Sequence, residues 1–190
     1  MHVFTRTTRS RRFRDVVVTE MTVTQIVIVG IAAVACVIDL RERRIPNWLT
    51  LSAALGGLVY QVAVAGTAGL VSGLAGWTVG VAIFFLPFVL RGLGGGDIKL
   101  LGALGAWVGP YDIVWLSLYT GVAGGVFALV VSLAGGYLRQ ALSNIWLLLM
   151  HLRLQGLRPL PELTIHHGSG PKLAYGTAIF AGVMVTVWMR

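Results

Sequence analysis

Apolar runs bounded by Gly, Pro and Arg follow one another along the chain, separated by short polar connections. Because a helix needs roughly 20 apolar residues to cross a bilayer, these runs are interpreted as membrane spans. They fall at about residues 22–39, 48–65, 69–90, 98–110, 113–134 and 172–189. The fourth run is short and rich in glycine, which is typical of a broken or tilted helix whose backbone is satisfied by neighbouring helices. The pattern predicts an all-α, polytopic membrane protein with about six transmembrane helices.

Composition supports this class. The chain is 56% hydrophobic and 12% charged, with a mean hydropathy of +0.82, whereas a soluble domain carries roughly 25% charged residues. The spans leave little chain for a soluble domain, so we expect residues 21–190 to form a single transmembrane domain. The only cysteine, Cys36, lies in an apolar run. This excludes an intramolecular disulfide and a cysteine-based zinc cluster, and favours a packing role.

Basic residues gather on one side of this predicted domain. Under six spans, the connections near Gly66 and Pro110 hold no Lys or Arg. The opposite side holds Arg41, Arg43, Arg44, Arg91, Lys99, Arg139, Arg153, Arg158 and Lys172. Because cytoplasmic loops carry an excess of Lys and Arg, the arginine-bearing side should face the cytoplasm. The net charge of +8 then indicates topology and contact with membrane lipids, and argues against a nucleic-acid partner.

The basic leader, residues 1–20, does not fit this orientation. It holds five arginines, yet one crossing separates it from the cytoplasmic side. Three explanations stay open. Translation starts at Met21, which we favour, and the leader is absent from the native protein; or the tail crosses against the bias, since later loops jointly set orientation; or residues 10–13 and 33–36 form a targeting signal, as they loosely match twin-arginine and lipoprotein signals.

The long connection over residues 136–170 lies on the arginine-bearing side. Its first part, residues 137–154, places a few polar residues among many apolar ones, which predicts a cytoplasmic interfacial helix in the headgroup region. Prolines then break regular structure within 158–161. The histidines of this side, His151, His166 and His167, lack the spacing and companion acids of a metal site, so we expect loop residues and no metal.

Two aspartates lie where apolar runs end. Asp39 follows the run 26–38, and Asp97 follows three glycines just after the run 81–90. A carboxylate at a membrane boundary is costly unless it is paired or used, so each acid is a candidate functional residue. Both lie on the arginine-bearing side of the predicted topology, which indicates one shared site.

Asp39 is followed by a basic turn that Pro46 closes. Proline disfavours helix at the preceding Ile45 and suits the first turn of the next helix, with Asn47 at the membrane interface. The alternative interpretation is structural. Asp39 then forms an ion pair with Arg43, one helical turn further on.

Asp97 is preceded by Gly94, Gly95 and Gly96. Successive glycines permit positive φ and close approach of another backbone, so they suit a sharp re-entry of the chain and leave room for a peptide substrate. The alternative is a flexible loop whose aspartate caps the following helix. Lys99 either favours a charged Asp97 or extends to lipid headgroups.

Together the two patterns resemble the type IV prepilin peptidases, membrane aspartic proteases of the GxGD class. The GxGD signature matches at residues 94–97 and continues into 98–100, and the second motif, an aspartate followed by Ile-Pro-Asn, matches as Asp39 with 45–47. A third stretch, residues 173–179, is similar to the last span of that family. The resemblance covers residues 22–189. The short form is most similar to the CpaA-like peptidases of Tad (Flp) pilus systems.

The resemblance implies a peptidase that removes a short basic leader from prepilins or pseudopilins, on the cytoplasmic side of a bacterial inner membrane. It implies Asp39 and Asp97 as catalytic residues, with a site shaped by Gly94, Gly95, Gly96, Lys99, Pro46 and Asn47. Larger members add an amino-terminal domain with paired cysteines and methylate the new amino terminus. This sequence has one cysteine and no segment large enough to bind a methyl donor, so we expect no methyl transfer.

Two carboxylates are sufficient for the chemistry. One takes a proton from water while the other, protonated, donates to the carbonyl oxygen and then to the leaving amine. Acids held close together in a low-dielectric site share a proton, and no metal or cofactor is needed. Asp39 ends a helix and Asp97 begins one, so the helix dipoles favour Asp39 as the proton donor.

Two non-enzymatic classes compete with this interpretation. A small transporter uses intramembrane acids as a proton or cation path, but usually places one near the bilayer centre, whereas both acids here lie at one edge. An assembly scaffold leaves the acids idle. We expect structural roles for two further acids. Glu42 lies among arginines and should form a solvated ion pair, and Asp112 should mark a turn and a helix start on the opposite side of the membrane.

Overall fold

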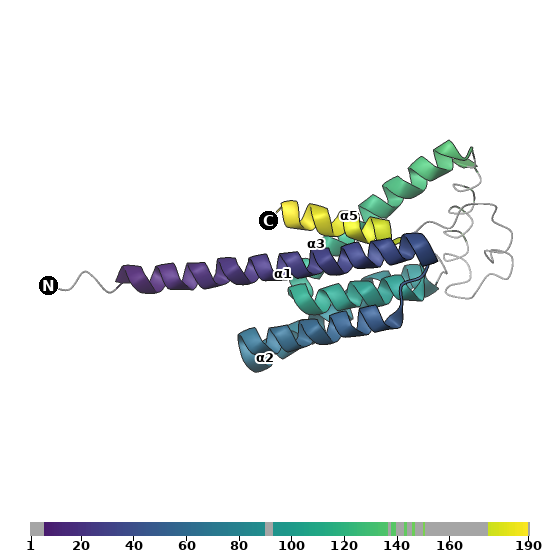
Figure 1. Cartoon of the computed structure of the whole chain (residues 1–190). Helices are drawn as coiled ribbons and strands as arrows, with labels where there is room; N and C mark the ends of the chain where they lie inside the picture. The colour runs from purple at the N-terminus through teal and green to yellow at the C-terminus, as the bar shows by residue number, and fades with distance from the viewer. Residues whose placement is uncertain are drawn as a thin grey trace.

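The computed structural model describes residues 6–89, 93–136, 138, 139, 143, 146, 150 and 175–189, with the backbone alone over residues 6–22. The elements with defined bounds are α1 (Arg6–Glu42), α2 (Asn47–Val89), α3 (Gly95–Ala134) and α5 (Tyr175–Trp188) (Figure 1). Within the described residues, three helices are long and apolar enough to cross a membrane, namely Val23–Glu42 of α1, α2 and α3, and α5 is a shorter apolar helix. The all-α membrane protein that the hydrophobic pattern predicts is confirmed.

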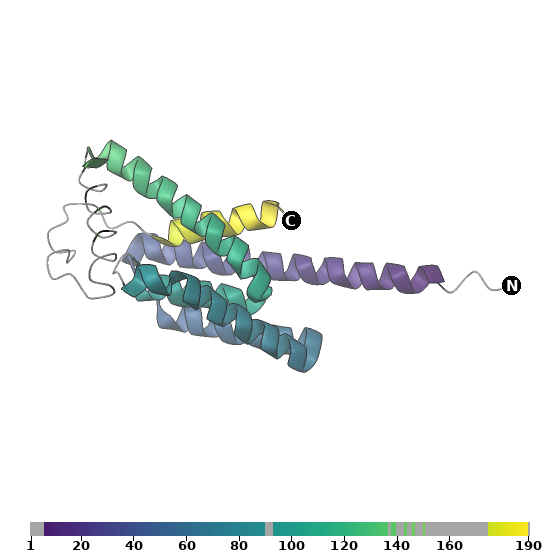
Figure 2. The same ribbon diagram turned by 180° about the vertical axis from the view of Figure 1, so that it is seen from behind.

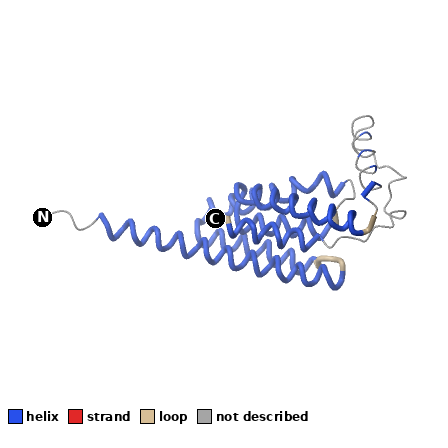
Figure 3. The backbone as a smooth tube through the Cα atoms, turned by 90° about the horizontal axis from the view of Figure 1, so that it is seen from above, coloured by secondary structure: helices blue, strands red, loops and turns tan. Residues whose placement is uncertain are grey.

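Helix α1 runs without a break through most of the leader and the first predicted span. Its amino-terminal part projects beyond the other helices, as Figures 1 and 3 show. The helix ends where Arg43 adopts a left-handed conformation with φ 53° and donates its N–H to the Asp39 carbonyl oxygen at 2.8 Å, a common way to stop a helix. Pro46 immediately precedes α2, and its carbonyl accepts the Leu49 N–H at 3.2 Å, so Pro46 opens the next helix as predicted.

A glycine interrupts the helical backbone in both α2 and α3. Gly66 has φ 60° and ψ −135°, and Gly109 has φ 80° and ψ 176°; only glycine adopts such positive φ values readily. The chain reverses at both positions, so each of these helices is a hairpin of two helical halves (Figures 1 and 2). Across the first reversal, a Cβ on Gly69 would overlap the Gln61 backbone. The reversals coincide with the connections near Gly66 and Pro110 that the sequence indicates.

The second half of α2 packs closely against the first half of α3. A Cβ on Gly76 would overlap the Gly105 backbone, and a Cβ on Gly80 would lie 2.7 Å from the Leu101 carbonyl oxygen. Lipid is as apolar as the protein interior, so the hydrophobic effect does not hold membrane helices together. Close packing at small residues stabilises their contacts instead. This contact holds the part of α3 that carries Asp97 firmly within the bundle.

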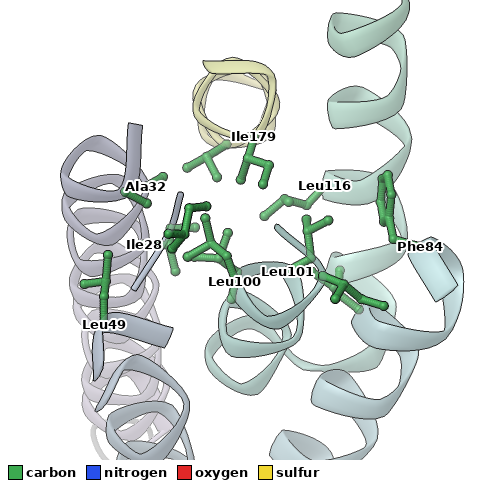
Figure 4. Packing of buried hydrophobic residues seen from close by; sticks show 14 residues of the cluster. Ile28, Ala32, Leu49, Phe84, Leu100, Leu101, Leu116 and Ile179 are labelled. Atoms are coloured by element: carbon green, nitrogen blue, oxygen red, sulfur yellow. The ribbon is translucent and has the colours of Figure 1, made fainter. Parts of the chain in front are cut away.

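Buried side chains from α1, α2, α3 and α5 meet in one cluster. Ile28 and Ala32 of α1 lie beside Leu100 of α3, with Ile179 of α5 above them (Figure 4). Leu100 and Ile179 are fully buried. The cluster extends along the four helices: Ile45 and Ile98 lie where α1 has ended and α3 begins, and Ile113 follows the reversal at Gly109. Residues far apart in sequence therefore meet in one core.

Several sequence-based expectations lie outside the described residues. The interfacial helix expected over 137–154 falls mostly there, as do the proline-containing segment 158–161 and the three histidines of that connection. The basic residues Arg91, Arg153, Arg158 and Lys172 also fall there. These expectations stay predictions.

Candidate active site

Asp39 and Asp97 are both buried and close to each other. Asp39 lies in the last turn of α1, and Asp97 in the first turn of α3. Their exposed fractions are 6% and 8%, and they are near enough for the charge of Asp39 to act on Asp97. The structure thus brings together the two acids that the sequence places in separate motifs.

Asp97 also caps its own helix. The Gly94 N–H donates to Asp97 Oδ2 at 3.1 Å, and the Asp97 N–H donates to the Gly94 carbonyl oxygen at 3.2 Å. This arrangement satisfies backbone groups that a helix start leaves without partners. The capping alternative is therefore observed, and it occurs together with proximity to Asp39. Capping uses one of the two carboxylate oxygens.

The three glycines serve a different purpose from the one expected. Gly94 is extended, with φ −77° and ψ 150°, and neither Gly95 nor Gly96 has a positive φ. What the chain needs is space: a Cβ on Gly96 would lie 2.9 Å from Ile45 Cβ and 3.1 Å from the Ile45 carbonyl oxygen. The sequence predicted that the backbone of a peptide substrate would approach these glycines, but at Gly96 the approaching backbone is that of Ile45 in the same chain.

A side-chain hydrogen bond joins the same two motifs at the surface. Lys99 Nζ donates to Asn47 Oδ1 at 2.8 Å, and both side chains are exposed. Together with the contact between Gly96 and Ile45, it fixes the segment around Pro46 against the start of α3. Pro46, Asn47, Lys99 and the glycines therefore belong to the two joined segments, one after Asp39 and one around Asp97. Their role in shaping a site stays a prediction.

Asp39 has a partner that sequence reasoning missed. The Gly176 N–H, at the start of α5, donates a buried hydrogen bond of 2.8 Å to Asp39 Oδ2. Arg43, the alternative partner, forms no ion pair with Asp39 in the described part of the chain. Glu42 pairs instead with Arg44, at 3.7 Å between Oε2 and Nε, and both side chains are exposed. The solvated ion pair predicted for Glu42 is confirmed.

Tyr175 was also missed as a site residue. It lies close enough to Asp97 for the two groups to interact electrostatically. Its ring meets Phe84 edge to face, with 6.3 Å between ring centroids. The only sequence signal was the resemblance of residues 173–179 to a family's last span, which gave neither Tyr175 nor Gly176 a role.

The site has no set of metal ligands. Among the described residues, no group of three or more His, Cys, Asp or Glu side chains lies together. Cys36, one turn before Asp39, is half-buried. Paired carboxylates with backbone N–H partners, at one end of a helical bundle, are what the structure offers for chemistry. That arrangement suits proton transfer to and from a bound peptide.

An all-helical membrane protein with paired, buried aspartates is the class that this fold and site define. The chain belongs to the type IV leader peptidase family, whose family model matches residues 26–129. The matched region contains Asp39, Asp97 and Lys99 and ends before α5. The resemblance of the chain to the type IV prepilin peptidases is therefore confirmed.

Three similar proteins carry the name "Prepilin leader peptidase/N-methyltransferase". The one from Burkholderia pseudomallei (strain 1026b) is 36% identical over 104 residues, which is 52% of this chain and 34% of the relative. The Aeromonas salmonicida (strain A449) protein is 32% identical over 99 residues, 48% of this chain and 34% of the relative. The Dickeya chrysanthemi protein is 35% identical over 101 residues, 50% of this chain and 36% of the relative. The match thus spans about a third of these relatives. No solved structure matches the chain.

Proposed function

We propose that this chain is a membrane aspartic endopeptidase that cleaves the leader peptide from prepilins or pseudopilins. The observation that carries the proposal is the meeting of Asp39 and Asp97, both buried, in a chain of the type IV leader peptidase family. Buried acids of this kind are costly unless they are used. Peptide hydrolysis is the use that an adjacent acid pair fits best.

In the proposed reaction, one carboxylate removes a proton from the attacking water, and the other, protonated, donates to the peptide carbonyl oxygen. The tetrahedral intermediate collapses when the leaving amine takes a proton from the acid pair. Each aspartate has one oxygen held by a backbone N–H, from Gly94 or Gly176, so both carboxylates are oriented before substrate binds. Preorganised groups of this kind lower the barrier because nothing must reorient during reaction.

Asp39 and Asp97 differ less in their tendency to hold the shared proton than the dipoles of α1 and α3 alone would indicate. Asp97 lies at the start of α3, and Asp39, at the end of α1, also faces the start of α5 through Gly176. The amino-terminal ends of two helices therefore point at the pair, one at each carboxylate. The argument that Asp39 is the preferred proton donor considers only the dipole of α1, whose end carries Asp39. The start of α5 at Gly176 acts in the opposite direction.

We further propose six crossings, one by α1, two by each of the hairpins α2 and α3, and one by α5. The first half of α3, residues 95–108, is about 21 Å long at 1.5 Å per residue, shorter than a hydrocarbon core of roughly 30 Å. This fits the short fourth span. Arg41, Arg43 and Arg44 follow Asp39 closely in sequence, so the positive-inside rule favours a site on the cytoplasmic side. The bacterial inner membrane is proposed from the family resemblance alone.

The proposed substrate presents its short basic leader to the site from the cytoplasm. We propose, from the resemblance to CpaA-like peptidases alone, that the chain serves a Tad (Flp) pilus or a related secretion system. We assign leader cleavage and no methyl transfer to the chain. The methylating members of the family carry paired cysteines, whereas this sequence holds only Cys36.

Purified protein in liposomes, incubated with a prepilin that retains its leader, tests the proposal. Mass spectrometry should find one new amino terminus at the leader boundary. Glu42→Gln is the matched control, since it removes an exposed acid from the same end of α1 and should cleave like the wild type. Labelling a cysteine at position 41 in a Cys36→Ala background, from inside or outside spheroplasts, tests the side. An uncleaved prepilin contradicts the function, and labelling from outside contradicts the orientation.

A further inference from the structure

We infer that the start of α5 belongs to the active site: Gly176 positions the Asp39 carboxylate, and Tyr175 holds Gly176 in place. The inference deepens the proposed function and rests on it. Helix α5 lies outside residues 26–129, which match the family model, and the resemblance of residues 173–179 to the family's last span gives neither Tyr175 nor Gly176 a role.

Gly176 meets Asp39 through both a hydrogen bond and direct contact. Its N–H donates 2.8 Å to Asp39 Oδ2 in a buried environment. Gly176 is the second described residue of α5, and its backbone N–H is directed at the Asp39 carboxylate. A Cβ on residue 176 would lie 2.9 Å from both Asp39 Cβ and Asp39 Oδ2. Any side chain here must push α5 and Asp39 apart.

Tyr175 fixes the position from which Gly176 donates. Its ring rests on α3 at Gly124, where a Cβ would lie 2.8 Å from Tyr175 Cε2 and 3.0 Å from its hydroxyl oxygen. The ring also meets Phe84 of α2 edge to face. The ring therefore contacts two helices, α2 and α3. A chain of contacts runs from Gly124 through Tyr175 to Gly176 and Asp39.

These contacts give a positioning role and not a catalytic one. The backbone of Asp39 is set by α1, while one of its carboxylate oxygens is set by α5. A displacement of about 1 Å in a reacting group costs roughly 100-fold in rate. The position of α5 relative to Asp39 therefore affects the rate of the chemical step more than it affects binding of the prepilin.

Two pairs of variants test this in the full chain in liposomes. Gly176→Ala should lower kcat for prepilin cleavage by roughly 100-fold, with KM within about twofold, because the lost interaction acts in the transition state. Its control is Met184→Ala in the same helix, because the Met184 side chain is exposed and its removal leaves the packing of α5 in place. It should leave kcat near wild type.

The second pair acts from α3. Gly124→Ala should displace the Tyr175 ring and reproduce the kcat defect of Gly176→Ala. Gly125→Ala is the control at the next residue, because a methyl group there meets no described atom within 4 Å. It should cleave at the wild-type rate. Wild-type kcat in Gly176→Ala, or an equal loss of kcat in Met184→Ala, overturns the inference. The proposed function stands in either case as long as the wild type cleaves the prepilin.

The hydrogen bond itself has a readout that needs no substrate. Amide hydrogen exchange in protein labelled with ¹⁵N-glycine should show Gly176 N–H protected in the wild type and exchanging faster in Asp39→Ala. Equal exchange in both proteins overturns the inference. If the wild type cleaves no prepilin, the proposed function fails, and the exchange measurement still decides whether α5 holds Asp39.

Discussion

Lys99 Nζ donates a hydrogen bond of 2.8 Å to Asn47 Oδ1, across 52 residues of sequence. Asn47 begins α2 and Lys99 lies in the first turns of α3. The pair therefore fastens the segment after Asp39 to the segment that carries Asp97. Because both side chains are exposed, the bond acts through geometry more than through stability.

Removal of either end of this bond should weaken the enzyme by a similar amount. An exposed bond to a charged group contributes up to about 1 kcal/mol, which corresponds to roughly fivefold in rate. Asn47→Ala and Lys99→Met should each lower kcat/KM for prepilin cleavage by up to that factor, and the double variant should be no worse than either single one. Effects that multiply in the double variant contradict a shared role for the two residues.

Gly96 should tolerate no side chain, whereas its neighbour Gly95 should. A Cβ on Gly96 would lie 2.9 Å from Ile45 Cβ, but a Cβ on Gly95 would make an ordinary 3.6 Å contact with the Phe88 ring. Gly96→Ala must therefore separate the two motifs, and we expect a loss of cleavage of at least roughly tenfold, since small displacements of reacting groups are costly. Gly95→Ala should remain active. The reverse order of activities in a liposome assay counts against the contact.

Gly109 should be needed for stability and not for chemistry. Its φ of 80° with ψ 176° lies in a region populated almost only by glycine, so Gly109→Ala should lower the free energy of unfolding by about 1–3 kcal/mol. Gly125→Ala, in the helical part of α3 beside open space, should raise it by about 0.5–1 kcal/mol. Thermal unfolding in detergent micelles measures both. Equal stabilities of the two variants contradict the reversal at Gly109.

Sequence reasoning located the acids because a buried carboxylate carries a strong physical signal in an apolar chain. It also placed the reversals, since Gly66 and the Gly109-Pro110 step interrupt apolar runs. It missed Gly176, which lies 137 residues from Asp39 and acts through its backbone N–H and its lack of a side chain. A glycine that acts through its backbone has no reactive side chain by which a single sequence could identify it.

The glycine run shows a second limit. Gly94, Gly95 and Gly96 correctly indicated close approach of another backbone, but not which one. Positive φ was the wrong reason, because the run leads into α3 with φ values outside the left-handed region. The partner of Gly96 is Ile45, and only the packing of α2 against α3 identifies it.

The central claim is that Asp39 and Asp97 act together on a peptide bond. Cleavage of a leader-bearing prepilin in liposomes, followed by mass spectrometry, tests it most directly with Asp39→Asn and Asp97→Asn beside the wild type and Glu42→Gln. Asparagine preserves shape but can neither accept nor donate the required proton at neutral pH. Both Asn variants should insert and unfold like the wild type, yet give no product, while Glu42→Gln cleaves normally. Product from either Asn variant at the wild-type rate would contradict the account.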